Sequence, residues 1–220
     1  MNLNRDIWDL YVVTDRKLAH GRSHEVVASA AVAGGARVIQ LRDKEMTTRE
    51  LIDTGLRLKE IVHRAGGILI INDRVDVALA IDADGVHLGQ EDMPPRLGRK
   101  MLGREKVIGV SVSTVEEAIS AEKDGADYLG ASAIFATPTK IDAAPIGIEG
   151  LRRICESVRI PVVAIGGMNK GNVEQVIRAG AAGIAVVSAV VSAPDVSAAA
   201  LELLQEVRRV KASMIAPHAP

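Results

Sequence analysis

Short apolar runs alternate along the chain with longer amphipathic stretches, and a polar group follows nearly every apolar run. Runs such as 68–71 and 162–165 are continuously apolar, which is the pattern of strands that are buried on both faces. Seven of the runs are followed by charged, hydroxyl or glycine residues. The strands expected from this pattern are 10–14, 37–41, 68–71, 84–88, 107–112, 127–131, 162–165 and 183–187.

Helical patterns fill the intervals between these runs. Apolar residues recur at helical spacing through 47–65, where Thr47 and Glu50 predict a capping box, and Thr114 with Glu117 predicts a second one. Further helices are expected from Pro94-Pro95 onward, at 172–179 and at 198–210. Strands that alternate with helices indicate βαβ units and a parallel sheet. Eight such units in 220 residues favour a single α/β domain, a (β/α)8 TIM barrel, over a doubly wound sheet.

The composition limits the number of domains, the make-up of the core and the class of protein. Residues 1–220 are expected to form one domain with a disordered tail at 212–220, and a 2% aromatic content requires a core of Val, Ile, Leu and Ala. A net charge of −1 argues against nucleic-acid binding. The N-terminus carries no signal-peptide pattern, and the apolar run 179–193 is too short to span a membrane, so a soluble, cytoplasmic protein is expected. Association of the chain with itself is left open.

The single cysteine excludes an internal disulfide and any CxxC motif, and Cys155 is expected to be a buried, inert thiol. His20, His24 and His63 share no metal-ligand spacing and are expected at the surface. His87 falls inside a strand, where a hydrogen-bonded structural role is expected. Because no nucleophile is paired with a histidine, the sequence gives no support to covalent catalysis.

The polar groups that follow the strands are expected to meet, because the carboxyl ends of parallel strands point to one face of a barrel. Asp73 and Asp92 follow the third and fourth strands, which are neighbours in this order. Each aspartate alone is equally well explained by a helix N-terminus. Together they match the way Mg²⁺ is held, by one or two carboxylates with water and substrate phosphates.

Cations and glycines complete a phosphate-binding pattern on the same face. Gln40, Arg42 and Lys44 alternate directly after an apolar run, so their side chains share one direction, and the two cations suit a pyrophosphate. Gly166-Gly167 and Ser188 follow the seventh and eighth strands, a recurrent phosphate site in such barrels, although a double glycine also serves tight turns. The irregular segment 135–147 is typical of a lid. It contains Lys140, a third cation or an exposed loop lysine.

Taken in order, these motifs resemble the thiamine phosphate synthase family over about residues 10–190. The motifs are Tyr-Val-Val-Thr-Asp (11–15), Gln-Leu-Arg-Asp-Lys (40–44), Ile-Asn-Asp-Arg (71–74), Gly-Val-His-Leu-Gly-Gln-Glu-Asp (85–92), Gly-Val-Ser (109–111), Ala-Thr-Pro-Thr-Lys (136–140), Ala-Ile-Gly-Gly (164–167) and Val-Val-Ser (186–188). The resemblance implies a (β/α)8 barrel and a transferase of thiamine biosynthesis. In the implied reaction, a thiazole ethyl phosphate or its carboxylated tautomer displaces pyrophosphate from 4-amino-2-methyl-5-(diphosphooxymethyl)pyrimidine, giving thiamine phosphate.

The resemblance also implies roles for individual residues. The pyrimidine diphosphate would contact Gln40, Leu41, Arg42, Asp43, Lys44, Asn72, Ser111 and Lys140. The thiazole phosphate would contact Thr137, Pro138, Thr139, Gly167, Val187 and Ser188. Asp73 and Asp92 would hold one Mg²⁺ per subunit. Arg42, Lys44, Lys140 and Ser111 would act in catalysis by stabilising the leaving pyrophosphate. The thiazole nitrogen is itself the nucleophile, and pyrophosphate would depart before it attacks.

Two other functions compete with this interpretation. A thiazole tautomerase of similar fold needs neither paired carboxylates nor a pyrophosphate clamp, and Asp73, Asp92, Arg42 and Lys44 are all present. A non-catalytic protein that binds thiamine phosphate would not need a complete set of cations around a metal pair. The sequence therefore favours the synthase.

Overall fold

Eight parallel strands close into a barrel in sequence order in the computed structural model, which describes residues 5–136 and 145–215. Each strand pairs with the next, and the last pairs with the first through Leu10↔Ile184 and Val12↔Val186. The expected TIM barrel is confirmed, with every strand within one residue of its expected bounds. The strands are β1 (Leu10–Val13), β2 (Val38–Leu41), β3 (Ile68–Asn72), β4 (Gly85–Leu88), β5 (Val107–Val112), β6 (Tyr128–Ala131), β7 (Val162–Ile165) and β8 (Gly183–Val186).

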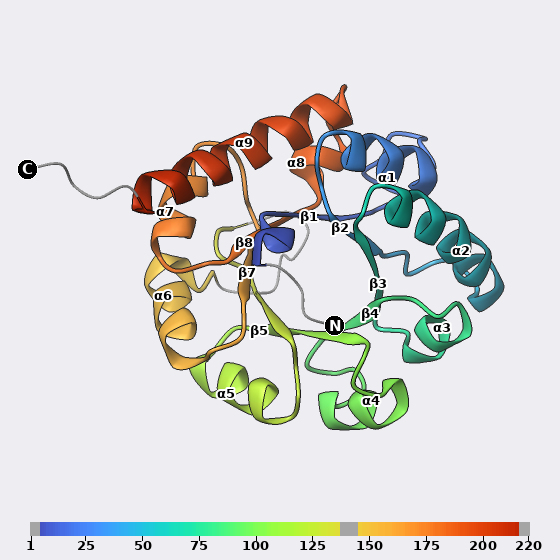
Figure 1. The fold of residues 1–220 in the computed structure, drawn as a ribbon, viewed down its shortest axis with the longest axis horizontal. Helices are drawn as coiled ribbons and strands as arrows, with labels where there is room; N and C mark the ends of the chain where they lie inside the picture. Colours follow the sequence, from blue (N-terminus) through green and yellow to red (C-terminus); the bar gives the residue numbers. More distant parts are fainter. Residues whose placement is uncertain (1–4, 137–144, 216–220) are drawn as a thin grey trace, which may run out of the picture.

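The helices form a ring outside the barrel, with the long last helix lying across α7, α8 and α1 (Figure 1). They are α1 (His24–Ala33), α2 (Thr48–Arg64), α3 (Val75–Ala80), α4 (Pro95–Leu102), α5 (Val115–Lys123), α6 (Gly147–Ser157), α7 (Val173–Arg178), α8 (Ser188–Val191) and α9 (Val196–Ile215). A short 3-10 helix, η1 (Arg5–Trp8), lies over the centre of the ring in Figure 1 and precedes β1.

The helix ends follow the sequence signals closely. The Thr47 hydroxyl accepts from the Glu50 backbone N–H at 3.3 Å and the Glu50 carboxylate accepts from the Thr47 N–H at 2.7 Å, which completes the expected capping box. The box at Thr114 and Glu117 is also present. Helix α9 continues to Ile215, beyond the expected end at 210, and residues 216–220 of the expected tail lie outside the described residues.

Apolar side chains form two layers because successive residues of a strand face opposite sides. One layer fills the space between the strands and the helices and includes Ile39, Leu69 and Leu129. The other fills the inside of the barrel and contains both tyrosines and the only tryptophan of the chain. Trp8 packs against Tyr128 with ring centroids 4.4 Å apart, so the few aromatic residues are concentrated inside the barrel.

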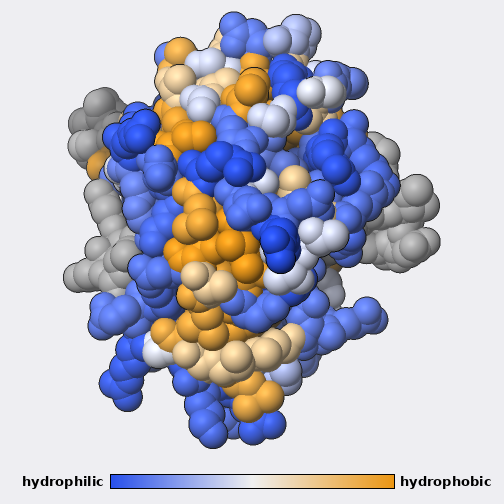
Figure 2. All heavy atoms as spheres, turned by 90° about the vertical axis from the view of Figure 1, so that its right-hand side faces the viewer, coloured by the Kyte–Doolittle hydropathy of each residue, from blue (hydrophilic) through white to orange (hydrophobic). Residues whose placement is uncertain are grey.

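The face of the molecule drawn in Figure 2 carries an apolar strip. On the side of α2, α3 and α4 in Figure 2, apolar residues run as a continuous strip between hydrophilic ones. The exposed large apolar side chains on these helices are Leu56, Leu79, Leu97 and Met101. Exposed apolar surface of this kind is typical of protein–protein contacts. No helix in the described part of the chain is both long and apolar enough to cross a membrane.

Of two residues predicted from the sequence alone, Cys155 lies as expected and His24 does not. Cys155 lies on α6 with restricted exposure, and burial raises the pKa of its thiol to about 12, as expected of an inert cysteine. The prediction of a surface position for His24 is wrong, because its side chain is only 4% exposed. The ring can be buried because each of its nitrogens has a hydrogen-bond partner, the Thr14 hydroxyl for one and the Asp43 carboxylate for the other.

Candidate active site

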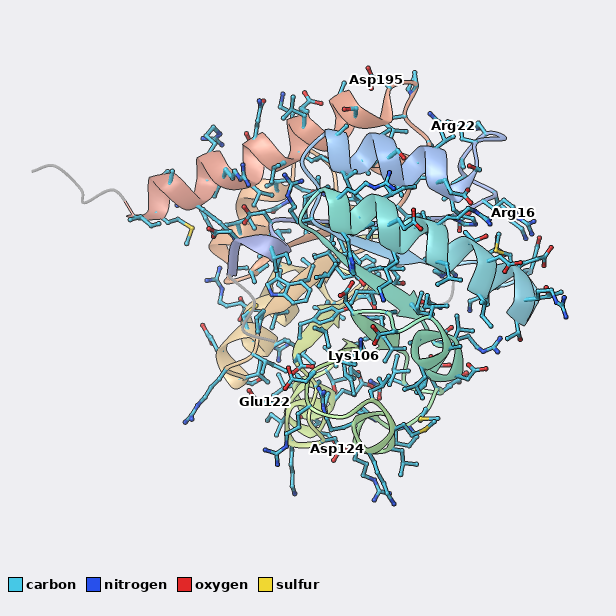
Figure 3. The ribbon with its side chains drawn as sticks, turned by 45° about the vertical axis from the view of Figure 1, so that its right-hand side comes forward. Arg16, Arg22, Lys106, Glu122, Asp124 and Asp195 are labelled. Carbon is cyan, nitrogen blue, oxygen red and sulfur yellow. The ribbon has the colours of Figure 1, made fainter. Side chains whose placement is uncertain are left out.

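A pocket of about 440 Å³ opens at the carboxyl ends of the strands. Arg16 and Arg22 belong to the loop after β1, so they show where this face lies. In Figure 3 they are at the end of the molecule opposite η1. All eight strands, or the loops that follow them, contribute residues to the lining of the pocket. Its lining includes Asp15, Gln40, Arg42, Asp43, Lys44, Asn72, His87, Ser111, Gly130, Ser132, Ile165, Gly166, Gly167, Val187 and Ser188.

The barrel register explains why the predicted residues meet. Asn72 pairs with His87, and Ser111 pairs with Gly130, so these positions lie at one level of neighbouring strands. Inward-facing positions alternate with positions that face the helices. Gln40 therefore points into the barrel, whereas Leu41 is buried in the layer between strands and helices. Of the predicted pyrimidine contacts, Leu41 can reach the pocket only through its backbone.

Asp73 and Asp92 face one another, as expected from neighbouring strands. A hydrogen bond joins their carboxyl groups, and Asp92 Oδ2 also accepts from the Gly89 backbone N–H at 2.7 Å. Burial raises the pKa of Asp73 to about 6, the nearby Asp92 adds to the rise, and Lys44 and Arg42 oppose it. Asp73 has φ +60, a left-handed conformation that is uncommon outside glycine, and it is not the cap of α3.

This pair fits a divalent cation. A proton shared between two carboxylates removes their mutual repulsion. A bound divalent cation would do the same and would take the place of that proton. Within the described ranges, no cluster of three His, Cys, Asp or Glu side chains has metal-binding geometry. A site of two carboxylates completed by water and substrate phosphates suits Mg²⁺.

Arg42 is held at the rim by an acidic residue that sequence reasoning did not assign. Its Nη1 lies 3.1 Å from Asp15 Oδ2, and the other oxygen of Asp15 accepts from the Leu18 backbone N–H at 3.1 Å. Asp15 therefore fixes one side of the guanidinium and leaves its remaining N–H groups for a ligand. Lys44 is exposed and lines the same pocket.

Asp43 has a different surrounding from its neighbours in the motif. Its side chain is 4% exposed, its Oδ1 accepts from the backbone N–H groups of Glu45 and Met46, and its Oδ2 contacts His24 and Arg16. Burial by itself raises the pKa of Asp43, but these hydrogen bonds outweigh it and leave the pKa lowered. The side chain thus holds the loop after β2 in shape, and any contact with a ligand would come from its backbone.

The part of the pocket that follows β7 and β8 carries the glycines and the serine predicted for a second phosphate. Gly166 and Gly167 have φ of +101 and +70, which other residues rarely adopt. A Cβ on Gly167 would lie 2.8 Å from Phe135 Cβ, so the backbone of the segment after β6 approaches closely here. Ser188 begins α8 directly after Val187. Thr137, Pro138, Thr139 and Lys140, and most of the expected lid, lie outside the described residues.

A hydrogen-bonded line of side chains crosses the pocket floor. The sequence assigned its two ends, Gln40 and Ser111, to the site, and the hydrogen-bonded role expected of His87 is confirmed. Gln40 Nε2 donates to Tyr11 Oη, which lies 2.9 Å from Tyr128 Oη. Tyr128 Oη lies 2.8 Å from His87 Nδ1, and His87 Nε2 lies 2.9 Å from Ser111 Oγ. We call Tyr11, Tyr128 and His87 the relay. The period-two pattern would have placed all three inside the barrel with Gln40 and Ser111.

Known proteins match this chain closely. A family model described as thiamine monophosphate synthase matches residues 10–190. A thiamine-phosphate synthase of Chloroflexus aurantiacus is 59% identical over 197 residues, covering 89% of this chain and 91% of the relative. One of Moorella thermoacetica is 53% identical over 205 residues, covering 93% and 98%. A solved structure of thiamine phosphate pyrophosphorylase from Pyrococcus furiosus has a TM-score of 0.87 at 48% identity, covering 94% of this chain and 98% of that one.

The family match spans all eight strands and every described residue of the predicted site. The relatives match over nearly their whole length, so the likeness is not confined to one motif or to the barrel fold. The chain belongs to the thiamine monophosphate synthase family.

Proposed function

We propose that this transferase joins 4-amino-2-methyl-5-(diphosphooxymethyl)pyrimidine to a thiazole ethyl phosphate, with Mg²⁺ held by Asp73 and Asp92. The carboxylate pair carries this proposal. Asp73 and Asp92 meet beside Arg42 and Lys44, and the pKa of Asp73 is raised to about 6. Two carboxylates in contact repel each other unless a proton or a cation lies between them, and a bound Mg²⁺ would also neutralise negative charge on a leaving pyrophosphate.

The residues around the pair have separate tasks. Arg42, fixed by Asp15 at 3.1 Å, and the exposed Lys44 supply positive charge to the diphosphate. Arg42 is already oriented before substrate arrives, so little reorganisation is needed as negative charge develops on the leaving group. Asn72 and Ser111 supply neutral polar groups on the adjoining strands.

The thiazole side is mostly apolar apart from its phosphate subsite. Ile165, Met168 and Val187 line the pocket there, next to Gly167 and Ser188. An apolar wall beside the reacting carbon would keep water away from a positively charged pyrimidine, so that the thiazole nitrogen attacks it. The thiazole nitrogen needs no general base to attack, so the proposed mechanism requires no catalytic histidine.

One assay tests the proposal. Purified protein is supplied with both phosphorylated substrates and Mg²⁺, and thiamine phosphate and pyrophosphate are measured together. We expect the two products in equal amounts and loss of both when Mg²⁺ is chelated and not replaced. Turnover that is unchanged by chelation would contradict the metal site. Conversion of one thiazole tautomer into another without thiamine phosphate formation would favour the tautomerase.

A further inference from the structure

The relay joins two residues that the proposed function places in the pyrimidine subsite. Gln40 lies on β2 and Ser111 on β5, and the relay connects them through β1, β6 and β4 across the inside of the barrel. Gln40, Ser111 and the relay all line the same pocket. A ligand in the pocket can therefore contact both ends of one continuous hydrogen-bonded line.

The ring positions in the relay are fixed by packing. A Cβ on Gly109 would lie 2.0 Å from Tyr128 Cζ, and one on Gly130 would lie 3.0 Å from His87 Cε1. These glycines leave the space that the two rings occupy. Tyr11 is 2% exposed and Tyr128 is fully buried, so neither hydroxyl can turn to water for an alternative partner. The relay is thus a fixed element of the barrel interior.

Each hydroxyl in the relay carries a single proton, and this imposes one order on the hydrogen bonds. Burial raises the pKa of both tyrosines, so both hydroxyls stay protonated at neutral pH. Tyr11 accepts from the Gln40 amide and so donates its proton to Tyr128. Tyr128 then donates to His87 Nδ1, which leaves the imidazole proton on Nε2 for Ser111 Oγ.

This order determines what the two ends present to a ligand. Gln40 lines the pocket and none of the described residues donates to its Oε1, so they leave this oxygen to accept from a ligand. Ser111 Oγ accepts from His87, which leaves its hydroxyl proton to donate. Reversing either end requires the Gln40 amide to turn round and every proton in the line to shift.

We propose that Tyr11, Tyr128 and His87 are positioning residues that make the pyrimidine subsite selective for a donor group at Gln40 and an acceptor at Ser111. Resting on the proposed function, this means selection of a 4-amino pyrimidine over the 4-oxo analogue. The oxo group would place an acceptor against the Gln40 oxygen. A buried polar group left without a partner weakens binding by about 10- to 100-fold.

The variants Tyr11→Phe and Tyr128→Phe test the inference, since each removes one hydroxyl and keeps the ring. The measurement is kcat/KM for the 4-amino diphosphate divided by that for its 4-oxo analogue, at saturating thiazole phosphate. We expect the wild-type ratio to fall at least about tenfold in each variant. The double variant should fall no further than either single one, because one break already uncouples Gln40 from Ser111. The KM for the thiazole phosphate should stay unchanged.

Trp8→Phe is the matched control. Trp8 packs against Tyr128 in the same buried cluster but takes no part in the line of hydrogen bonds. We expect this variant to be less stable to heat with an unaltered selectivity ratio. A loss of selectivity equal to that of the tyrosine variants would assign the effect to packing and overturn the inference.

A binding measurement separates this inference from the proposed function. Calorimetry with the 4-amino and 4-oxo pyrimidine monophosphates, which lack a pyrophosphate leaving group, compares affinities without turnover. If the wild type prefers the amino compound and Tyr11→Phe does not, the positioning role of the relay is supported. Equal affinities in the wild type, or a preference that the variant retains, overturn it. Failure of the wild type to form thiamine phosphate would instead contradict the proposed function.

Discussion

Asp43 and His24 form a buried pair, with Oδ2 of Asp43 3.2 Å from Nε2 of His24 and both side chains 4% exposed. The other ring nitrogen of His24 lies 2.9 Å from the Thr14 hydroxyl, which also donates to the Gln40 carbonyl at 3.1 Å and accepts from the Arg42 N–H at 3.3 Å. The pair thus ties α1 to the loop that presents Arg42 and Lys44 to the pocket. We therefore expect the pair to hold that loop in place.

We expect Asp43→Asn to raise the KM for the pyrimidine diphosphate about tenfold and to lower the melting temperature. The amide keeps one acceptor oxygen but loses the charge that Arg16 and His24 contact, so the loop becomes less ordered. Steady-state kinetics and thermal unfolding check this. Glu45→Gln is the control, since Glu45 contacts Arg16 and Lys17 at the exposed surface. A KM as low as that of the control would show that the pair does not position the loop.

Asp92→Ala should abolish synthesis while the protein stays folded. The substitution removes one proposed ligand of Mg²⁺ and one hydrogen bond to Gly89, a loss of about 1 kcal/mol of stability. Activity is measured across a Mg²⁺ titration, with folding followed by circular dichroism. Asp76→Ala, which removes an exposed carboxylate paired with Arg74, should retain activity. Full activity of folded Asp92→Ala at low Mg²⁺ would remove Asp92 from the metal site.

Mg²⁺ affinity should depend on pH through Asp73. In the metal-free protein the pKa of this carboxyl is about 6, so below that pH the group is protonated and the cation must displace a proton. Affinity should therefore fall as pH falls through 6 and level off above it. Calorimetric titration with Mg²⁺ at several pH values measures this. In Asp92→Asn the fall should begin at lower pH, because Asp92 contributes to the raised pKa; an unshifted midpoint would contradict the coupling.

Arg42→Lys should lower kcat about 10- to 100-fold with a smaller change in the KM for the pyrimidine diphosphate. An ammonium group keeps the charge but cannot contact Asp15 and phosphate oxygens together in the way a planar guanidinium does. Steady-state kinetics with each substrate varied against a saturating partner test this. Arg57→Lys, at an exposed contact with Glu25 outside the pocket, is the control. Kinetics like those of the control would place Arg42 outside the site.

Gly167→Val should raise the KM for the thiazole phosphate far more than the KM for the pyrimidine diphosphate. The added side chain would meet Phe135 at the part of the pocket that follows β7, whereas Arg42 follows β2. The left-handed φ of +70 also adds roughly 1–2 kcal/mol of strain. Gly21→Val carries similar strain at φ +82 in open space and controls for it. An equal rise in both KM values would contradict separate subsites.

The order of the elements follows from local sequence. Apolar runs, capping residues such as Thr47 and Thr114, and glycines act on neighbouring residues, so they predict strands and helices before any tertiary contact is known. The parallel order then places whatever follows each strand on one face, which is why Asp73 and Arg42 could be grouped from their positions alone.

The contacts between residues far apart in the sequence depend on closure of the barrel. His24 and Asp43 are 19 residues apart, and Tyr11 and Tyr128 are 117 apart, on β1 and β6. In the sequence these tyrosines resemble core filling, and His24 resembles a surface residue at a helix start. Only when eight strands surround one axis do inward-facing side chains from distant strands come within hydrogen-bond distance, because the interior is narrow enough for them to meet across it.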